Sequence, residues 1–385
     1  MTKNKKIDIL FLALIVVALF VRLVLAIAVP GEDFDIKAHR TWVSEINDIG
    51  LLDFYAKSSE IEGVTTFNLP PATAYLFSGL GLLSDLLLSG EVPTWLLKLP
   101  AIGFDILIGL AIYLLLRRFY AVPLALLAAC FFLFNPGIIY NSACWGQIDS
   151  IFSFFLLLAF ILLAQRREGA GAFFLAISLL LKLQAIVFVP LFLWLVWRRR
   201  NAKTALLALL IFLLAVLALA APFIIDGQSG ELYEKIWQKS YHYTSRASVN
   251  AFNLWGAVNV FSGEALKDDV SIIGAVTPKH LGLGLFSLAY VFVLYFTSKA
   301  TSRWAVFFAG AFIACSFFLL PTEIHERYLY PTLVFLPLCF PKRRLAVGLL
   351  ILGFSFTYFI NLVLVYPLLA AIQSGMVLSF LNIIF

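Results

Sequence analysis

The feature that most constrains this chain is a series of apolar runs, each about 16 to 24 residues long, separated by short polar clusters. A helix needs about 20 apolar residues to cross a hydrocarbon core about 30 Å thick. No water in that layer can satisfy backbone N–H and C=O groups, so each run is expected to be helical. Hydrophobic residues make up 62% of the chain and charged residues 13%, which excludes an ordinary soluble domain. We predict an all-α polytopic membrane protein, a single domain over 1–385 with about 11–12 transmembrane helices.

The basic residues between the runs predict the orientation. With a cytoplasmic N-terminus, the inner clusters contain sixteen Lys and Arg and only two acids, Asp8 and Glu168. The net charge of +6 is therefore interpreted as an orientation signal, and no nucleic-acid partner is expected. The basic residues of these clusters are Lys3, Lys5, Lys6, Arg117, Arg118, Arg166, Arg167, Arg198, Arg199, Arg200, Lys203, Lys299, Arg303, Lys342, Arg343 and Arg344.

Two long polar segments, 29–94 and 222–280, are expected on the outer face. The apolar stretch from Ala72 to Leu88 could cross the membrane or lie in its outer interface. The second choice places every later basic cluster inside, so the first outer loop is predicted to carry interfacial helices. The tail from Tyr366 to Phe385 could cross once more. The four cysteines have no metal-binding spacing, and no disulfide is expected.

Between Arg167 and Arg198 the chain has only enough length for two short passes. We predict two short helices that meet within the membrane at Lys182-Leu183-Gln184. Irregular backbone at that depth requires a protein or watery lining. Arg22, in the first apolar run, is expected to reach the outer interface by extending its side chain.

The first outer segment holds a candidate general base. In a helix that starts near Asp35, the side chains of Asp35, His39 and Trp42 share one face at i, i+4 and i+7. A carboxylate beside an imidazole could accept a proton from a substrate. The alternative interpretation is structural, with Asp33 or Asp35 as the N-cap of the helix.

Two further polar clusters are expected on the same side. Trp145, Gln147 and Asp149 gather at the mouth of a helix, where the alternative is an interfacial aromatic residue followed by an N-cap Asp. Cations at membrane depth usually face a ligand or a counter-ion, and Lys and Arg both suit phosphate. The cations here are Lys182, His325 and Arg327. The alternative is an internal salt bridge, Glu326 with Arg327 or Lys182 with a buried acid such as Asp105.

These segments resemble membrane glycosyltransferases of the GT-C class. The stretch from Asp35 to Trp42 resembles the first-loop motif of dolichyl-phosphate-glucose-dependent glucosyltransferases, and Pro70-Pro71-Ala72-Thr73-Ala74-Tyr75 is similar to their Pro-Pro-Leu-Thr-Ala-Tyr. Trp145-Gly146-Gln147-Ile148-Asp149-Ser150 and the stretch from Ile324 to Pro331 are similar to prokaryotic membrane proteins grouped with the mannosyltransferases of GPI-anchor assembly. The matches occur in family order along the chain.

The resemblance implies an inverting transferase that moves a hexose, mannose or glucose, from a polyprenyl-phosphate donor to a lipid-linked or glycan acceptor. The reaction would take place on the outer face of a prokaryotic plasma membrane, with membrane lipids around the protein. Asp35 would be the general base, with His325, Arg327 and Lys182 on the donor phosphate. The residues implied to line the substrate pocket are His39, Trp145, Gln147, Asp149 and Glu326.

No cofactor is required by this chemistry, although Asp33 and Asp35 could hold a divalent metal. The chain departs from the glucosyltransferase pattern at Asn68, where those enzymes often have an acid. Two other classes remain open. A lipid-linked sugar flippase or transporter would need no base, and a glycan polymerase or ligase would take an oligosaccharide donor.

Overall fold

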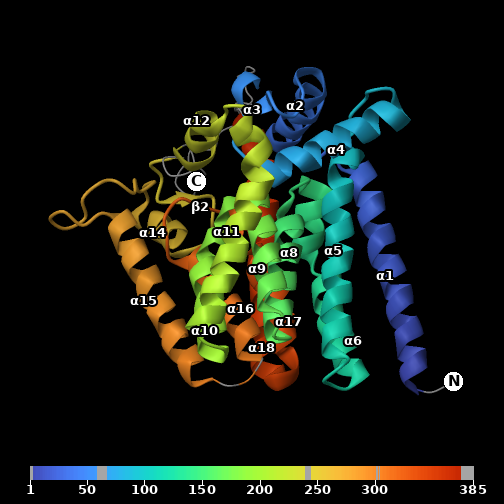
Figure 1. Ribbon diagram of the computed structural model, residues 1–385, viewed down its shortest axis with the longest axis vertical. Coiled ribbons are helices and arrows are strands. Elements are labelled where there is room, and N and C mark those ends of the chain that lie inside the picture. Colours follow the sequence, from blue (N-terminus) through green and yellow to red (C-terminus); the bar gives the residue numbers. More distant parts are fainter. Residues whose placement is uncertain (1–2, 59–66, 239–243, 301, 303, 374–385) are drawn as a thin grey trace. The chain divides into compact units, whose positions relative to one another are not determined.

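The computed structural model describes residues 3–58, 67–238, 244–300, 302 and 304–373 (Figure 1). About 80% of the structure is helical, which confirms the predicted all-α class. Two short strands, β1 (Ser248–Val249) and β2 (Ile324–His325), pair in parallel. Arg303 and the tail beyond residue 373, for which the sequence makes predictions, lie outside the described residues. The four cysteines, all within the described ranges, are free thiols.

Six of the described helices are long and apolar enough to cross a membrane. A bent pair, α6 (Val122–Leu133) with Pro136–Trp145, could form a seventh span across a 46° break. The chain is thus a multi-pass integral membrane protein, while the total of 11–12 spans and the side of each terminus stay predictions. The six helices are α1 (Lys3–Ala28), α4 (Pro71–Leu88), α5 (Thr94–Leu116), α11 (Ala202–Ile225), α15 (Pro278–Lys299) and α18 (Arg344–Gln373).

The chain forms two compact units. Unit 1 comprises Met1–Val16, Ile108–Asn141 and Tyr243–Phe385, and unit 2 comprises Val17–Leu107 and Ser142–His242. Both α1 and α5 contribute residues to each unit.

Unit 2 contains a bundle of helices that is interrupted at Lys182. In this bundle α8 (Asp149–Ala164) packs along α9 (Glu168–Leu181), and α9 packs along α11 (Figure 1). Lys182 ends α9 in an extended conformation (φ −153°, ψ 124°), and η2 (Leu183–Phe188) leads into α10 (Val189–Arg199). The predicted pair of short helices is therefore confirmed. The carbonyl of Leu181, freed by the break, accepts a hydrogen bond from Thr73 Oγ1 at 2.7 Å.

Further helices lie at one end of unit 2. They are α2 (Asp33–Ile49), α3 (Phe54–Lys57), α4, α12 (Ser229–Leu232) and the π-helix η3 (Tyr233–Gln238). Figure 1 shows α4 lying across the ends of α8 and α9 rather than along them. Its interfacial location stays a prediction, because length and composition would also let it span. An aromatic core that includes Trp42, Phe67 and Phe77 holds α2 on α4.

The opposite end of unit 2 carries the basic clusters. There the Glu168 carboxylate pairs with Arg200, with Nε and Oε1 2.7 Å apart. The clusters at Arg166–Arg167 and Arg198–Arg200 thus lie at the far end of the helices from α2, as the charge pattern predicts. The second outer segment begins slightly later than expected, because α11 continues through Pro222 to Ile225.

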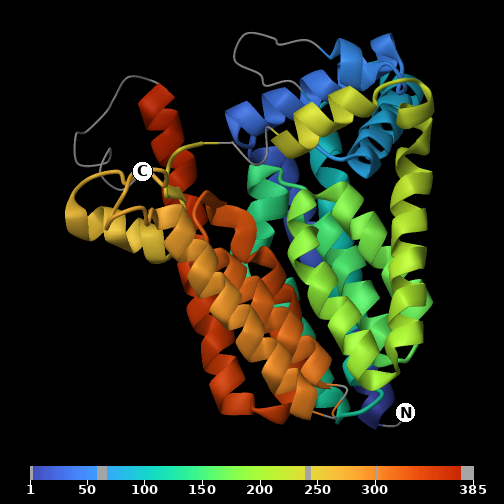
Figure 2. The same cartoon turned by 60° about the vertical axis from the view of Figure 1, so that its left-hand side comes forward.

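Unit 1 is built around α15, α16 (Trp304–Leu319), α17 (Tyr330–Cys339) and α18. Figure 2 shows these helices, coloured orange to red, packed side by side, and the contacts between them agree. Asn135 caps α7 (Pro136–Ile139) and donates from Nδ2 to Ser355 Oγ at 2.6 Å, which ties the break after α6 to α18. Asp8, one of the two acids of the inner clusters, pairs with Arg117 at 3.0 Å.

Arg22 does not extend to an interface, contrary to the prediction. Its side chain is fully buried in unit 2, and Nε lies 3.0 Å from Oδ2 of the equally buried Asp105. Because Asp105, 83 residues away along the chain, balances its charge, the Arg22 guanidinium does not have to reach water. Asp105 is therefore the counter-ion of Arg22 rather than of Lys182.

We expect Asp105→Ala to lower the free energy of unfolding by about 3–5 kcal/mol, because it leaves the Arg22 guanidinium buried without its counter-ion. The exposed pair Lys57–Asp53 is the matched control, and Asp53→Ala should cost less than about 1 kcal/mol. The measurement is the apparent melting temperature of each purified variant in one detergent. Equal melting temperatures would contradict a stabilising role for the buried pair.

Candidate active site

The start of α2 leaves the Asp35 side chain available. Glu32 is the N-cap, and its carboxylate accepts from the Asp35 backbone N–H at 2.7 Å. The alternative interpretation of Asp33 or Asp35 as N-cap is therefore wrong. The local sequence does not tell which of the three acids at positions 32, 33 and 35 caps the helix. In the structure the capping Glu32 is buried. Asp33 is exposed.

The Asp35 carboxylate is held by two side chains from a distant segment. Trp145 Nε1 donates to Asp35 Oδ2 at 2.8 Å, and Gln147 Nε2 donates to the same oxygen. Trp145 and Gln147 are buried, whereas Asp35 is half-buried. Within the described residues Oδ1 receives no hydrogen bond. Two donors on one oxygen orient the carboxylate and leave the other oxygen able to accept a proton, an arrangement suited to a general base.

The segment that carries Trp145 and Gln147 is fastened to α2 by its backbone. Glu32 N–H donates to the Trp145 carbonyl at 3.1 Å. Gly31 and Gly146, with φ of +93° and +98°, lie on either side of the Ile36 side chain, and a Cβ on either glycine would overlap it. Two residues without side chains thus allow the two segments to approach closely.

Lys98 is a site residue that the sequence analysis missed. It is fully buried in α5, and its Nζ donates to the Val29 carbonyl at 2.7 Å. Its Cε lies beside Gly146, so this ammonium borders the loop that holds Asp35. A lone lysine inside an apolar run was the signal that could have drawn attention to it.

The rest of the α2 face lies in the aromatic core. The His39 ring is buried, 5.8 Å from the Trp42 ring and 5.3 Å from the Phe77 ring. The predicted shared face is therefore divided between a half-buried carboxylate at Trp145 and an imidazole packed against α4.

Lys182 and the fully buried Asp149 form an ion pair between Nζ and Oδ1. Ile148 occupies the N-cap position of α8, so the interpretation of Asp149 as an N-cap is wrong. The Lys182 ammonium also lies 5.6 Å from the centre of the Phe152 ring. The internal salt bridge that the sequence allowed for Lys182 is thus present, with a different acid from Asp105.

His325, Glu326 and Arg327 belong to unit 1. The strand β2 places His325 opposite Val249 of β1. Glu326 pairs with Arg327, whose Nη1 lies 2.9 Å from Oε1, and with His325 Nδ1 at 3.8 Å. The Glu326–Arg327 salt bridge is therefore present as the sequence allowed. Nearby, burial raises the pKa of Glu323, although the Lys279 ammonium at 2.7 Å opposes the shift.

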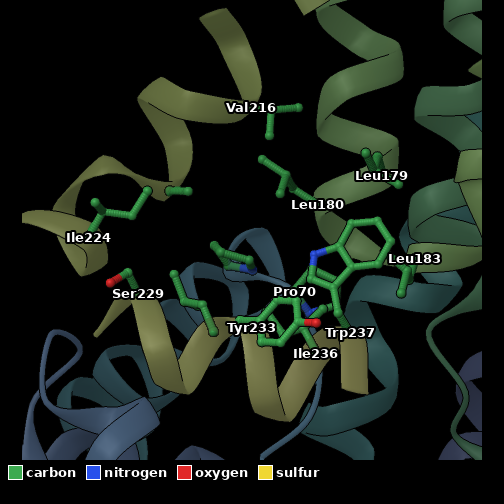
Figure 3. Close-up of a pocket in the computed structure, with 13 residues that line it drawn as sticks. Pro70, Leu179, Leu180, Leu183, Val216, Ile224, Ser229, Tyr233, Ile236 and Trp237 are labelled. Atoms are coloured by element: carbon green, nitrogen blue, oxygen red, sulfur yellow. The ribbon is translucent and has the colours of Figure 1, made fainter. Parts of the chain in front are cut away.

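An apolar pocket of about 260 Å³ opens in unit 2 (Figure 3). Figure 3 shows Tyr233, Ile236 and Trp237 of η3 on one side and Leu180 of α9 with Val216 of α11 on the other. Tyr233 and Trp237 are 66% and 49% exposed, so they mark the mouth. Leu183, the chain neighbour of Lys182, also lines the pocket. The other lining residues are Pro70, Pro71, Leu179, Ala220, Ile224, Ser229 and Leu232.

Among the described residues, no group of three or more His, Cys, Asp and Glu side chains has the geometry of a metal site. Asp33 and Asp35, the candidate ligands from the sequence, thus have no third side chain of these types beside them in that part of the chain, and a metal at this pair stays a prediction.

We expect Gly146→Ala to destabilise the site, since a side chain at φ +98° is strained by about 1–3 kcal/mol and would displace Ile36. Gly103, in a helix with open space around it, is the matched control, and Gly103→Ala should be neutral or slightly stabilising. Apparent melting temperatures of the two variants make the comparison. A Gly146→Ala protein as stable as Gly103→Ala would show that the close approach is unimportant.

A comparison with protein-family models matches residues 67–321 to glycosyltransferase family 87. A search of curated proteins finds no match. The matched region contains Trp145, Gln147, Asp149 and Lys182, while Asp35 precedes it and His325 to Arg327 follow it. The match covers more than half of the chain, so this membrane protein belongs to glycosyltransferase family 87 and is a transferase with a sugar donor and an acceptor.

Proposed function

We propose that this glycosyltransferase is a GT-C-class enzyme that transfers a hexose, mannose or glucose, from a polyprenyl-phosphate donor to a lipid-linked or glycan acceptor. The observation that carries the proposal is the Asp35 carboxylate held by Trp145 and Gln147. The reaction takes place at the outer face of a prokaryotic plasma membrane. In support, the basic clusters of unit 2 lie at the far end of its helices from α2.

The proposed step is a direct displacement with inversion. The acceptor oxygen attacks the anomeric carbon from the side opposite the phosphate while its proton passes to Asp35 Oδ1. The bond between the anomeric carbon and the phosphate oxygen breaks, and its electron pair leaves on polyprenyl phosphate. The two hydrogen bonds on Oδ2 hold the carboxylate in position as the proton arrives.

The leaving phosphate needs positive charge as it departs. Lys182 is proposed for this role in unit 2, since its ammonium is a compact positive charge that Asp149 holds in place. In this proposal Asp149 orients the Lys182 ammonium toward the donor phosphate. For His325 and Arg327 the same role is proposed on the sequence motif, and for His39 and Glu326 a place in the substrate pocket. A divalent metal at Asp33 and Asp35 is a further proposal that mutation can test.

The apolar pocket suits the polyprenyl chain of the donor. Its lining is almost wholly aliphatic and aromatic, so water leaves it at little cost and an isoprenoid chain gains by entering. Leu183 lines the pocket and is bonded to Lys182. A lipid phosphate at the ammonium could therefore place its chain in the pocket without crossing the bundle.

We expect Asp35→Asn to lower the rate of hexose transfer by about 10²–10⁴-fold, because the amide accepts no proton. The fold should survive, since Asp35 is not the N-cap and Asn can still accept from Trp145 and Gln147. The assay uses purified protein with polyprenyl-phosphate-mannose, polyprenyl-phosphate-glucose and a membrane lipid extract as the source of acceptor. Asp48→Asn, an exposed change on the same helix, is the control.

Three results are informative. Transfer by wild type and Asp48→Asn but not by Asp35→Asn supports the base and identifies the hexose. Equal transfer by all three removes Asp35 as the base and favours a flippase or transporter, which needs none. Loss of activity in Asp33→Asn, with activity restored by added Mn²⁺ or Mg²⁺, would favour a metal at Asp33 and Asp35.

Filling the pocket should weaken the binding of long donors. Ala220→Phe places a ring in the pocket and is expected to raise the donor KM by about tenfold, on the order of the free energy of burying a few methylene groups. Ala218→Phe, on the exposed side of the same helix, is the matched control. Comparison of a long polyprenyl donor with a short-chain analogue makes the test. An equal KM change for both donors would argue against the pocket as the chain site.

A further inference from the structure

A continuous path of buried contacts in unit 2 leads from an ion pair to the proposed base. Arg22 Nε donates to Asp105 Oδ2 at 3.0 Å, and Ser142 Oγ donates to the same oxygen at 2.6 Å. Arg22, Asp105 and Ser142 are all fully buried. Ser142 is three residues before Trp145, which donates to Asp35.

The segment between Ser142 and Trp145 is a π-helical turn, part of η1 (Tyr140–Trp145). Such turns are uncommon and are often found at functional sites, so a contact that holds this one in place is of interest. The Asp105 carboxylate supplies one such contact from α5. At the end of this turn the Trp145 indole donates to Asp35, and the Trp145 carbonyl accepts from the Glu32 N–H.

We propose that the buried Arg22–Asp105 pair positions the general base, acting through Ser142 and Trp145. The proposal rests on the proposed role of Asp35. The charge pair holds one carboxylate oxygen in a defined place, Ser142 fixes the π-turn to that oxygen, and the turn sets the hydrogen bond that orients Asp35. Arg22, Asp105 and Ser142 do not contact the reacting atoms in this proposal, so they are positioning residues.

The buried charge gives the path its rigidity. Arg22 also donates from Nη1 to the carbonyl of Ala18, so the guanidinium is held by its own helix as well as by Asp105. An ionised acceptor forms stronger and better-directed hydrogen bonds than a neutral one. A neutral acceptor in place of Asp105 would leave the Ser142 hydroxyl less firmly bound and the π-turn freer to relax into an α-helix.

The test begins with Ser142→Ala, which removes the hydroxyl and leaves the ion pair intact. Its matched control is Ser150→Ala, another fully buried serine whose Oγ donates to a carbonyl of α5, that of Ala101, at 2.8 Å. We expect Ser142→Ala to lower kcat about 5- to 10-fold with the donor KM nearly unchanged, the loss of about one oriented hydrogen bond. Ser150→Ala should change kcat less than about twofold at a similar melting temperature.

A double-mutant cycle separates positioning from general stability. Trp145→Phe removes the indole donor to Asp35, so in that background Ser142→Ala should have little further effect on kcat. Equal factors in both backgrounds, or equal losses in Ser142→Ala and Ser150→Ala, would overturn the inference. If Ser142→Ala fails to fold, Arg22→Lys, which keeps the buried charge but changes the geometry, is tested in the same cycle.

Asp35→Asn is measured in parallel and distinguishes the two failures. An inactive Asp35→Asn protein with an additive cycle would overturn the positioning path alone. A fully active Asp35→Asn protein would overturn the proposed base, and the inference with it.

Discussion

The charges that lie within apolar helices determine much of this structure, because an ion taken out of water must find a partner. Arg22 meets Asp105, and Lys182 meets Asp149. The first pair joins α1 to α5 across 83 residues of the chain, and the second joins the start of α8 to the end of α9, so each counter-ion helps to hold two helices together. The break after α9 places the Lys182 ammonium beside Asp149, and Thr73 satisfies the freed carbonyl of Leu181.

The local features of the fold could be predicted from the sequence, because they depend on runs of apolar residues and on breaks within them. The helices, the break at Lys182 and the salt bridge at Glu326 follow from spacing and charge alone. The features that failed depend on contacts at long range. Whether Arg22 extends to water or stays buried depends on Asp105, and no local pattern reveals that partner. Asp33 and Asp35 are as suitable as Glu32 for an N-cap until Trp145 and Gln147 are placed against Asp35.

The candidate site shows the same division. The sequence identified Asp35, Trp145, Gln147, Asp149 and Lys182 by residue type, and the structure brings the first three together and pairs the last two. The sequence did not identify Lys98 or Ser142, because their buried contacts belong to no recognisable motif. The family assignment covers a sugar transferase, while the order of contacts around Asp35 suggests how one such enzyme could hold its base in an apolar surrounding.

The apolar pocket, between the aromatic side chains of η3 and the helices α9 and α11, has a consequence for how this enzyme would meet the proposed lipid donor. A lipid that enters by such a route arrives by diffusion in two dimensions. Its relevant concentration is the number of donor molecules per unit area of bilayer, so swelling the aqueous volume leaves occupancy unchanged, whereas enlarging the membrane dilutes the substrate. Turnover would then respond to the fluidity and lipid composition of the bilayer as directly as to the chemistry at Asp35.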